Sequence, residues 1–212
     1  MNSLDLFTLD LNRYLFELNQ FDLLLSEAEL KESSDILPFF RENLHLSAFL
    51  ASYVPQIARI DRIKHEFTFF GDFRADLVVG DSDKKVYCFI EFEDATRTSI
   101  FINKKNRSTP AWSPRFEQGF SQIVDWFWKI DDFKNTVQFR SVFGSETIEV
   151  YGMLIIGRDS FLTDIDKSRL NWRLNKVVVD SRKIICITFD QLARDLRNRL
   201  SLYSLVLESN LE

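Results

Sequence analysis

The sequence predicts an α/β fold in which helices cover a mixed β-sheet. Three observations lead to this class. Two helical segments open the chain, strand-like segments follow in the middle, and two continuous apolar strands alternate with helices toward the C-terminus. Apolar runs such as "IEVYGMLIIGR" and "KIICITF" are typical of strands that are buried on both faces. Strands that alternate with helices favour a sheet packed between helical layers.

The helical segments come first. Residues 9–31 place leucines and aromatic side chains at helical spacing, which predicts an amphipathic helix. Ser34 or Asp35 can cap a second helix that runs to about Tyr53 and ends before Pro55. We therefore expect a helical N-terminal segment, residues 1–39, in front of a domain at residues 40–212.

Strands follow the helices. Residues 58–80 alternate well enough for two short strands, and the second ends at Gly80. "GDSDKK" is a polar turn, and "VYCFIEFE", residues 86–93, is the return strand. Residues 95–115 contain no acidic residue and predict a loop or irregular element.

The C-terminal half alternates helices and strands. Ser113 and Pro114 start a helix with an apolar stripe through Phe127. The strand at 148–158, a helix at 166–178 and the strand at 183–189 come next. Asp190 is expected to cap the closing helix.

Composition limits the kinds of chemistry. The 212 residues are 45% apolar with 21 Phe, which supplies a large core, and the net charge of −5 excludes a uniformly basic surface but not a local basic patch. We expect a cytoplasmic protein, because the sequence has no basic leader and no apolar run of membrane-spanning length. Two distant cysteines and two histidines make a zinc site improbable. Nucleotide-binding glycine motifs are absent, so no organic cofactor is expected, and any metal would take oxygen ligands.

An acidic cluster on the return strand needs an explanation. Strand side chains alternate faces, so Glu91 and Glu93 share one face. A turn centred near residues 82–83 would place Asp76 opposite Phe89, with Glu91 about 7 Å away on the diagonal. Mutual repulsion raises carboxylate pKa values, and a divalent cation removes that penalty. The pattern therefore predicts a Mg²⁺ or Mn²⁺ site to which the Phe92 carbonyl could add a ligand, whereas the alternative is a solvated edge hairpin.

The basic segment follows the acids directly. Beside a metal site it is typical of a patch that receives a phosphodiester backbone, whereas alone it would be a solvated loop. Arg158 ends a buried strand, where it suits either a phosphate contact or a salt bridge. The residues we expect to bind DNA are Arg97, Lys104, Lys105, Arg107, Arg115 and Arg158.

These residues resemble a known superfamily. Asp76, a spacer of fourteen residues and Glu91-Phe92-Glu93 are similar to the D…(D/E)xK signature of PD-(D/E)XK nucleases. The segments "FEQGFSQIVDWF", "YGMLIIGR", "LNWRLN" and "ICITFDQLARDL" resemble Shedu anti-phage defence proteins over about residues 40–202. The resemblance implies a PD-(D/E)XK nuclease-like mixed sheet flanked by helices, and a metal-dependent DNA endonuclease that forms a homo-oligomer.

The resemblance also assigns roles. Asp76 and Glu91 match the metal ligands, and Glu93 stands where the superfamily usually has a lysine, so it would position or deprotonate water or add a ligand. The same change could mark an inactivated copy, and Lys104 or Lys105 could replace the lysine. Gln118 or Gln122 would orient water or the phosphate. Glu42, Trp126, Arg169 and Arg173 carry weaker expectations: a surface acid, a core residue, and two arginines that face DNA or a neighbouring subunit.

Two other functions stay open at this point. A catalytically degenerate nuclease-fold module would bind DNA or regulate a partner without cleaving. A protein-binding domain with a wet hairpin would show neither metal affinity nor salt-dependent DNA binding.

Overall fold

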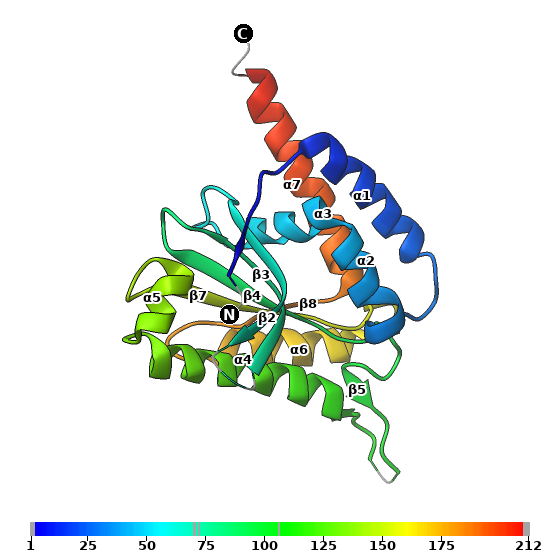
Figure 1. The fold of residues 1–212 in the computed structure, drawn as a ribbon. Helices are drawn as coiled ribbons and strands as arrows, with labels where there is room; N and C mark the ends of the chain where they lie inside the picture. Colours follow the sequence, from blue (N-terminus) through cyan, green and yellow to red (C-terminus); the bar gives the residue numbers. More distant parts are fainter. Residues whose placement is uncertain (1–2, 70, 72, 106, 210–212) are drawn as a thin grey trace.

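Six strands form one mixed sheet between two helical layers (Figure 1). The computed structural model describes residues 3–69, 71, 73–105 and 107–209, of which 69 and 202–209 are described by their backbone alone. The strand order is β1-β2-β3-β4-β7-β8, antiparallel from β1 to β4 and parallel from β4 to β8. This arrangement confirms the predicted mixed sheet flanked by helices. The strands are β1 (Asp5–Leu6), β2 (Arg62–Phe69), β3 (Phe73–Asp81), β4 (Val86–Phe92), β7 (Glu149–Ile155) and β8 (Ile185–Ile187).

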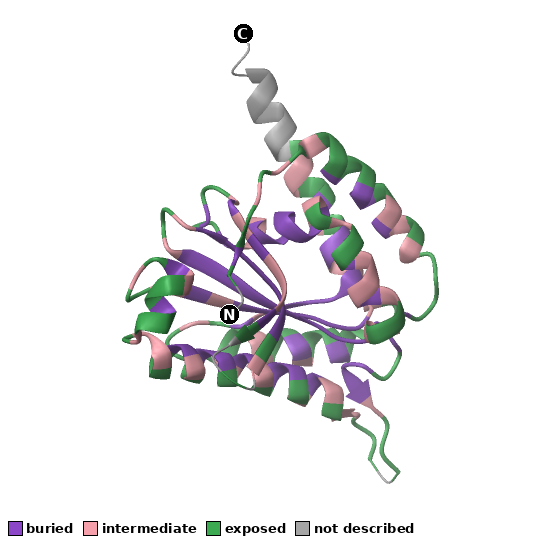
Figure 2. Ribbon diagram, viewed as in Figure 1, coloured by how far each residue is buried: buried purple, intermediate pink, exposed green. Residues whose placement is uncertain are grey.

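One helical layer contains the first helices of the chain and its last helix. Its members cover one face of the sheet, where Leu77, Ile90 and Phe92 join the core with Tyr14 and Leu196 (Figure 1). Figure 2 shows the strands of the sheet largely buried, while the exposed residues lie mainly on the outer sides of the helices and in the loops. The layer consists of α1 (Leu11–Leu24), the π-helix η1 (Glu32–Ile36), α2 (Leu37–Glu42), α3 (Leu44–Phe49), the 3-10 helix η2 (Leu50–Tyr53) and α7 (Phe189–Ser209).

The opposite face is covered by α4 (Pro114–Phe133), α5 (Val137–Phe143) and α6 (Asp164–Lys176). Val78 and Phe89 from the sheet pack there with Ile123 and Trp126 from α4. The Ser113 hydroxyl accepts the Phe116 N–H at 2.9 Å, which confirms the predicted start of α4. In the part of the chain that the structure describes, no helix is long and apolar enough to cross a bilayer.

The N-terminal helices differ from the prediction in two places. The second predicted helix is broken at Asn43, whose ψ of 72° is not helical. It also starts earlier than Ser34, because Asp94 accepts the Glu32 N–H at 2.8 Å and fixes the first turn from outside the segment. α2 runs from Leu37 to Glu42 and so continues across residue 39. The predicted domain boundary between residues 39 and 40 stays a prediction.

Three other elements also differ from the prediction. Residues 95–115 contain a hairpin, β5 (Phe101–Ile102) and β6 (Ala111–Trp112), in place of the expected loop. The short helix α5 was not predicted; Gly144 ends it with a left-handed φ of 65°. Thr188, rather than Asp190, caps α7, because its hydroxyl accepts the Gln191 N–H while Asp190 binds Arg158.

Gly152 lets α4 pack directly on β7. A Cβ built at this position would lie well inside van der Waals contact with Ile123 Cγ2 and 3.0 Å from Phe127 Cζ. We expect Gly152→Ala to lower the free energy of unfolding in urea by about 1–3 kcal/mol through overpacking. The double variant Ile123→Ala/Gly152→Ala should lose less than the sum of the single losses, because the main clashing methyl is gone. Strict additivity would contradict this packing.

Candidate active site

The register of β3 and β4 brings the predicted acids closer together than expected. Val78 pairs with Phe89 and Leu77 with Ile90, so continuation of the ladder sets Asp76 opposite Glu91. The prediction, with Asp76 opposite Phe89, was wrong by two residues. Asp81 causes the difference, because its carboxylate accepts the N–H groups of Asp83 and Lys84 at 3.0 Å and shapes a longer turn. A two-residue offset leaves each side chain on its predicted face.

The backbone of Phe92 faces Asp76. Asp76 Oδ2 accepts the Phe92 N–H at 2.9 Å, whereas the Glu93 N–H donates to Ile155 on β7 at 2.9 Å. Backbone polar groups alternate sides along a strand, so the Phe92 carbonyl lies on the same side as its N–H. Its ring points to the other face of the sheet and stacks on Phe40, with centroids 4.3 Å apart. The Phe92 carbonyl is therefore directed toward the Asp76 side of β4, where we expected it to be a metal ligand.

The acids line a polar cavity of about 530 Å³, which we call the acid cavity. All five residues predicted to be catalytic contribute to it, and they come from β3, the end of β4 and α4. Its lining consists of Glu32, Thr68, Arg74, Asp76, Glu91, Glu93, Arg115, Gln118 and Gln122.

Burial and repulsion disfavour the charged form of Glu91. Burial raises its pKa, and the nearby Asp76, Glu93 and Glu32 raise it further. Burial also raises the pKa of Asp76, although the Phe92 N–H opposes that change. Glu91 Oε2 is buried and has no hydrogen-bond partner in the described part of the chain. This oxygen therefore needs either a proton or a cation.

Glu93 has a different environment from the other two acids. Arg115 Nη1 donates to Glu93 Oε2 at 2.6 Å and to Glu32 Oε2 at 2.9 Å, and Asp94 lies 3.4 Å from Arg115 Nε. Burial raises the pKa of Glu93 to about 7, although Arg115 opposes the rise. The expectation that a single cation neutralises all three acids is thus wrong for Glu93, whose partner is an arginine. Arg115, predicted to bind DNA, contacts three carboxylates in this structure, and its DNA contact stays a prediction.

The first turns of α4 place the two glutamines at the rim. Gln118 is exposed beside the cavity, while Gln122 Nε2 donates to the Arg74 carbonyl at 3.2 Å. Gly119 permits the close approach of this helix, because a Cβ there would meet Leu154 Cδ1 at 2.8 Å and Glu93 Oε1 at 3.2 Å. Trp126 is fully buried, as expected of a core residue.

Sequence reasoning missed three lining residues, Glu32, Thr68 and Arg74. Arg74 was within its reach, because Arg74 and Asp76 are two apart on one strand and share a face. Glu32 carries no local signal; its place depends on the contact between η1 and Asp94. Glu42, expected to be a surface acid, is exposed on α2 and is not among the residues that line the cavity.

The basic residues predicted to bind DNA separate into different places. Lys104, Lys105 and Arg107 are exposed in the loop that joins β5 to β6, which we call the basic tip. The Arg97 guanidinium lies over the Phe161 ring, 4.7 Å from its centroid.

Arg158 has a structural role. Its side chain is only 10% exposed, and Nε donates to Asp190 Oδ1 at 2.7 Å. Its other nitrogens donate to the carbonyls of Leu25 and Glu27 at 3.0 and 2.9 Å. The salt bridge that the sequence left open for this residue is therefore present, and its DNA contact stays a prediction.

The donor set fits an ion held by few protein ligands. Mg²⁺ is commonly bound through one or two carboxylates and keeps several waters. Asp76, the unpaired Glu91 Oε2 and the inward-facing Phe92 carbonyl suit that requirement. Within the residues that the structure describes, no group of three His, Cys, Asp or Glu side chains is arranged to hold an ion. The site therefore fits a two-carboxylate centre and not a cage of three acids.

Comparison with known protein families identifies a match that covers the site. A family model described as Shedu protein SduA, C-terminal, matches residues 29–193, which cover more than half of the chain and include Glu32 and all of the acid cavity. No curated protein matches the chain.

Glu91→Gln should stabilise the protein in EDTA, and more so as the pH rises. An unfolded glutamic acid ionises near pH 4.3, while the folded pKa of Glu91 is higher, so the native state pays an increasing penalty above that pH. A difference of one unit between the two pKa values corresponds to about 1.4 kcal/mol. We expect a small gain in the free energy of unfolding at pH 5 and a larger one at pH 8. Glu42→Gln, which changes an exposed acid, is the matched control and should leave the free energy of unfolding unchanged at both pH values. Equal gains for Glu91→Gln at pH 5 and pH 8 would contradict a raised pKa of the buried Glu91 carboxyl.

Proposed function

This chain belongs to the family of the Shedu protein SduA C-terminal region, and on that premise we propose that it is a metal-dependent DNA endonuclease of the anti-phage defence type. One observation carries the proposal: Asp76 and Glu91 stand opposite each other, buried, beside a cavity, with Glu91 Oε2 unpaired among the described residues. Two buried like charges without a counter-charge are costly, and an inorganic cation supplies one.

Asp76, Glu91 and the Phe92 carbonyl would hold Mg²⁺ or Mn²⁺. Bound there, the ion would offset the charge of a phosphate and favour the ionisation of water. The protein's part is to fix these oxygens in advance, and the hydrogen bond from the Phe92 N–H to Asp76 restrains one of the two carboxylates.

The remaining lining residues have complementary roles in the proposal. Glu93 would accept a proton from the attacking water, and a pKa of about 7 suits a general base near neutral pH. Arg115 would restrain the Glu93 carboxylate through their 2.6 Å contact. Gln118, exposed at the rim, would orient water or the scissile phosphate. Arg74, whose side chain is 57% exposed and whose Nη1 lies 3.1 Å from Glu66 Oε1, would exchange this surface ion pair for a phosphate of the backbone.

DNA is the proposed substrate, and it would reach the cavity past α4 and the basic tip. Lys104, Lys105 and Arg107 are exposed there, and each would contribute salt-dependent attraction for phosphates. A cytoplasmic location and self-assembly into a homo-oligomer also belong to this proposal, and the homo-oligomer has its support in the family resemblance.

One observation favours a second candidate function. Glu93 stands where the superfamily usually has a lysine, and Arg115 already donates a hydrogen bond to it. The carboxylate proposed as the general base is therefore engaged in an ion pair. A catalytically degenerate module would keep the same fold, bind DNA or a partner, and leave phosphodiesters intact.

Plasmid nicking separates the two candidates. The native protein should nick supercoiled DNA in Mg²⁺ or Mn²⁺ and not in EDTA, and Glu91→Ala or Asp76→Ala should abolish the nicking. Glu93→Gln should slow it by about 100-fold, the usual contribution of a general base. The assay is gel conversion of supercoiled to open-circular plasmid.

Glu42→Ala, which changes an exposed acid away from the cavity, should nick at the native rate. Salt-dependent DNA binding without cleavage in either metal would support the degenerate module instead. Nicking that survives in both Glu91→Ala and Asp76→Ala would show that cleavage occurs elsewhere or by a contaminant.

A further inference from the structure

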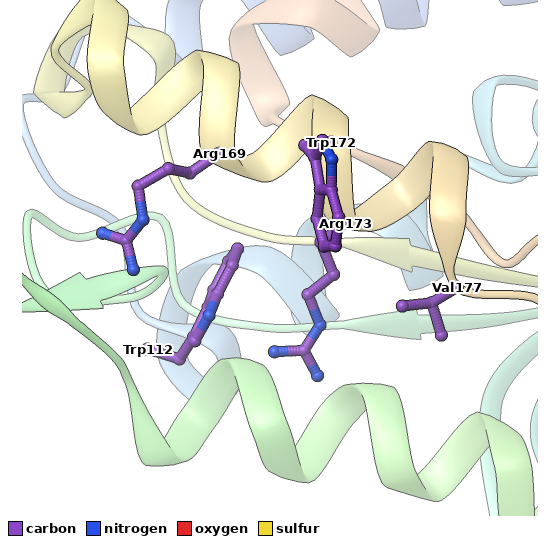
Figure 3. A pocket seen from close by; sticks show the side chains of 5 residues that line it. All are labelled: Trp112, Arg169, Trp172, Arg173 and Val177. Carbon is purple, nitrogen blue, oxygen red and sulfur yellow. The ribbon is translucent and has the colours of Figure 1, made fainter.

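A second cavity lies on the other side of α4. It has a volume of about 450 Å³ and shares no lining residue with the acid cavity. Figure 3 shows Trp172 and two arginines projecting from α6, with Trp112 of β6 facing them above α4. We call it the tryptophan pocket; it is lined by Trp112, Arg169, Trp172, Arg173 and Val177.

Trp172 presents an indole that the fold does not use. The residue is 66% exposed, although it lines a cavity. Among the described residues, no stacked ring and no cation contacts it, unlike Trp112, which stacks on Phe116 with centroids 4.7 Å apart. A large exposed indole beside a hollow is suited to a flat, apolar ligand group.

The arginines of the pocket are held rigidly. Arg173 makes two bonds to Glu117, at 2.6 and 2.7 Å, so its charge is paired. Arg169 donates to the Pro110 carbonyl at 2.9 Å and lies over the rings of Phe101 and Trp112.

Arg169 carries the more weakly paired of the two charges. Its carboxylate partner, Asp166, lies 4.0 Å from Nη1, whereas the partner of Arg173, Glu117, lies 2.6 Å away. Among the residues that the structure describes, no acidic side chain lines the pocket, so a ligand that enters it meets two guanidinium groups next to two indoles. A ligand that complements these groups has a flat ring and a negative charge.

Further basic side chains lie on the hairpin next to the tryptophan pocket. Trp112 stands at the base of the β5–β6 hairpin, whose loop is the basic tip of Lys104, Lys105 and Arg107. On α4, Phe116 and Glu117 contact pocket residues, whereas Arg115 and Gln118 line the acid cavity. The tryptophan pocket and the acid cavity therefore lie against different residues of the same first turns of α4, and the hairpin that carries the basic tip starts at the pocket.

We propose that the tryptophan pocket binds an unpaired nucleobase of a DNA single strand. The base stacks on the Trp172 indole, and the adjoining phosphates face Arg169 and the basic tip. Bases within a duplex are already stacked on both faces, so only an unpaired nucleotide offers its ring. The choice of DNA rests on the proposed function, whereas the binding itself requires neither metal nor cleavage.

The test measures binding in EDTA, in the background of Glu91→Gln, so that no cleavage interferes. The probe is a fluorescein-labelled oligodeoxythymidylate of about 15 nucleotides, followed by anisotropy at fixed salt. Trp172→Ala should weaken binding on the order of tenfold, because stacking of a base on an aromatic ring contributes that much. Trp172→Phe should keep most of the affinity, and binding of a duplex should be the same in all variants.

Trp128→Ala is the matched control. Trp128 is 59% exposed on α4 and lies outside the pocket, so its removal should leave the oligonucleotide affinity unchanged. A matching oligouridylate that binds more tightly than the DNA probe would overturn the choice of DNA. Because the binding assay excludes cleavage, failure of the nicking experiment leaves its result intact, and the reverse also holds.

Three results would overturn the pocket proposal. The first is unchanged affinity in Trp172→Ala. The second is an equal loss in Trp128→Ala. The third is a smaller particle by light scattering in Trp172→Ala with native DNA affinity, which would assign the exposed indole to contact between copies of the chain. Circular dichroism melting of each variant separates these outcomes from a loss of folding.

Discussion

The pairing of β3 with β4 sets two buried carboxylates against each other, and the features of the acid cavity follow from that repulsion. Asp76 relieves part of it by accepting the Phe92 N–H, whereas Glu91 has an oxygen without a partner among the described residues. Glu93, one step further along, is relieved by Arg115. The cavity thus contains one acid held by the backbone, one held by an arginine and one left for a proton or an ion. This division of roles explains why two neighbouring strands can bring three acids together without unfolding the sheet.

Much of this arrangement could be predicted because it depends on local rules. Alternation along β3 and β4 placed Asp76 and Glu91 on one face, and even a two-residue error in the turn kept them there. The apolar runs of β7 and β8 and the Ser113 cap of α4 were equally readable. Arg74 was readable by the same alternation.

The rest depends on contacts between elements that are distant in the sequence. Glu32 reaches the cavity only because Asp94, 62 residues away, accepts its N–H. Arg158 looks like a phosphate ligand at a strand end, yet the carbonyls of Leu25 and Glu27 bind it. The role of Asp190 was misjudged for the same reason, since Arg158 occupies the carboxylate expected to cap α7. A single sequence without an alignment gives no measure of which polar side chain finds which distant partner.

Arg115 also has a mechanical consequence. It begins on α4, under one face of the sheet, and its carboxylate partners come from η1 of the other layer and from the end of β4. The guanidinium therefore links the two helical layers at the point where the central strand β4 ends. Neither layer can slide past the other without breaking this junction, and any such displacement would at once alter the electric field on Glu93.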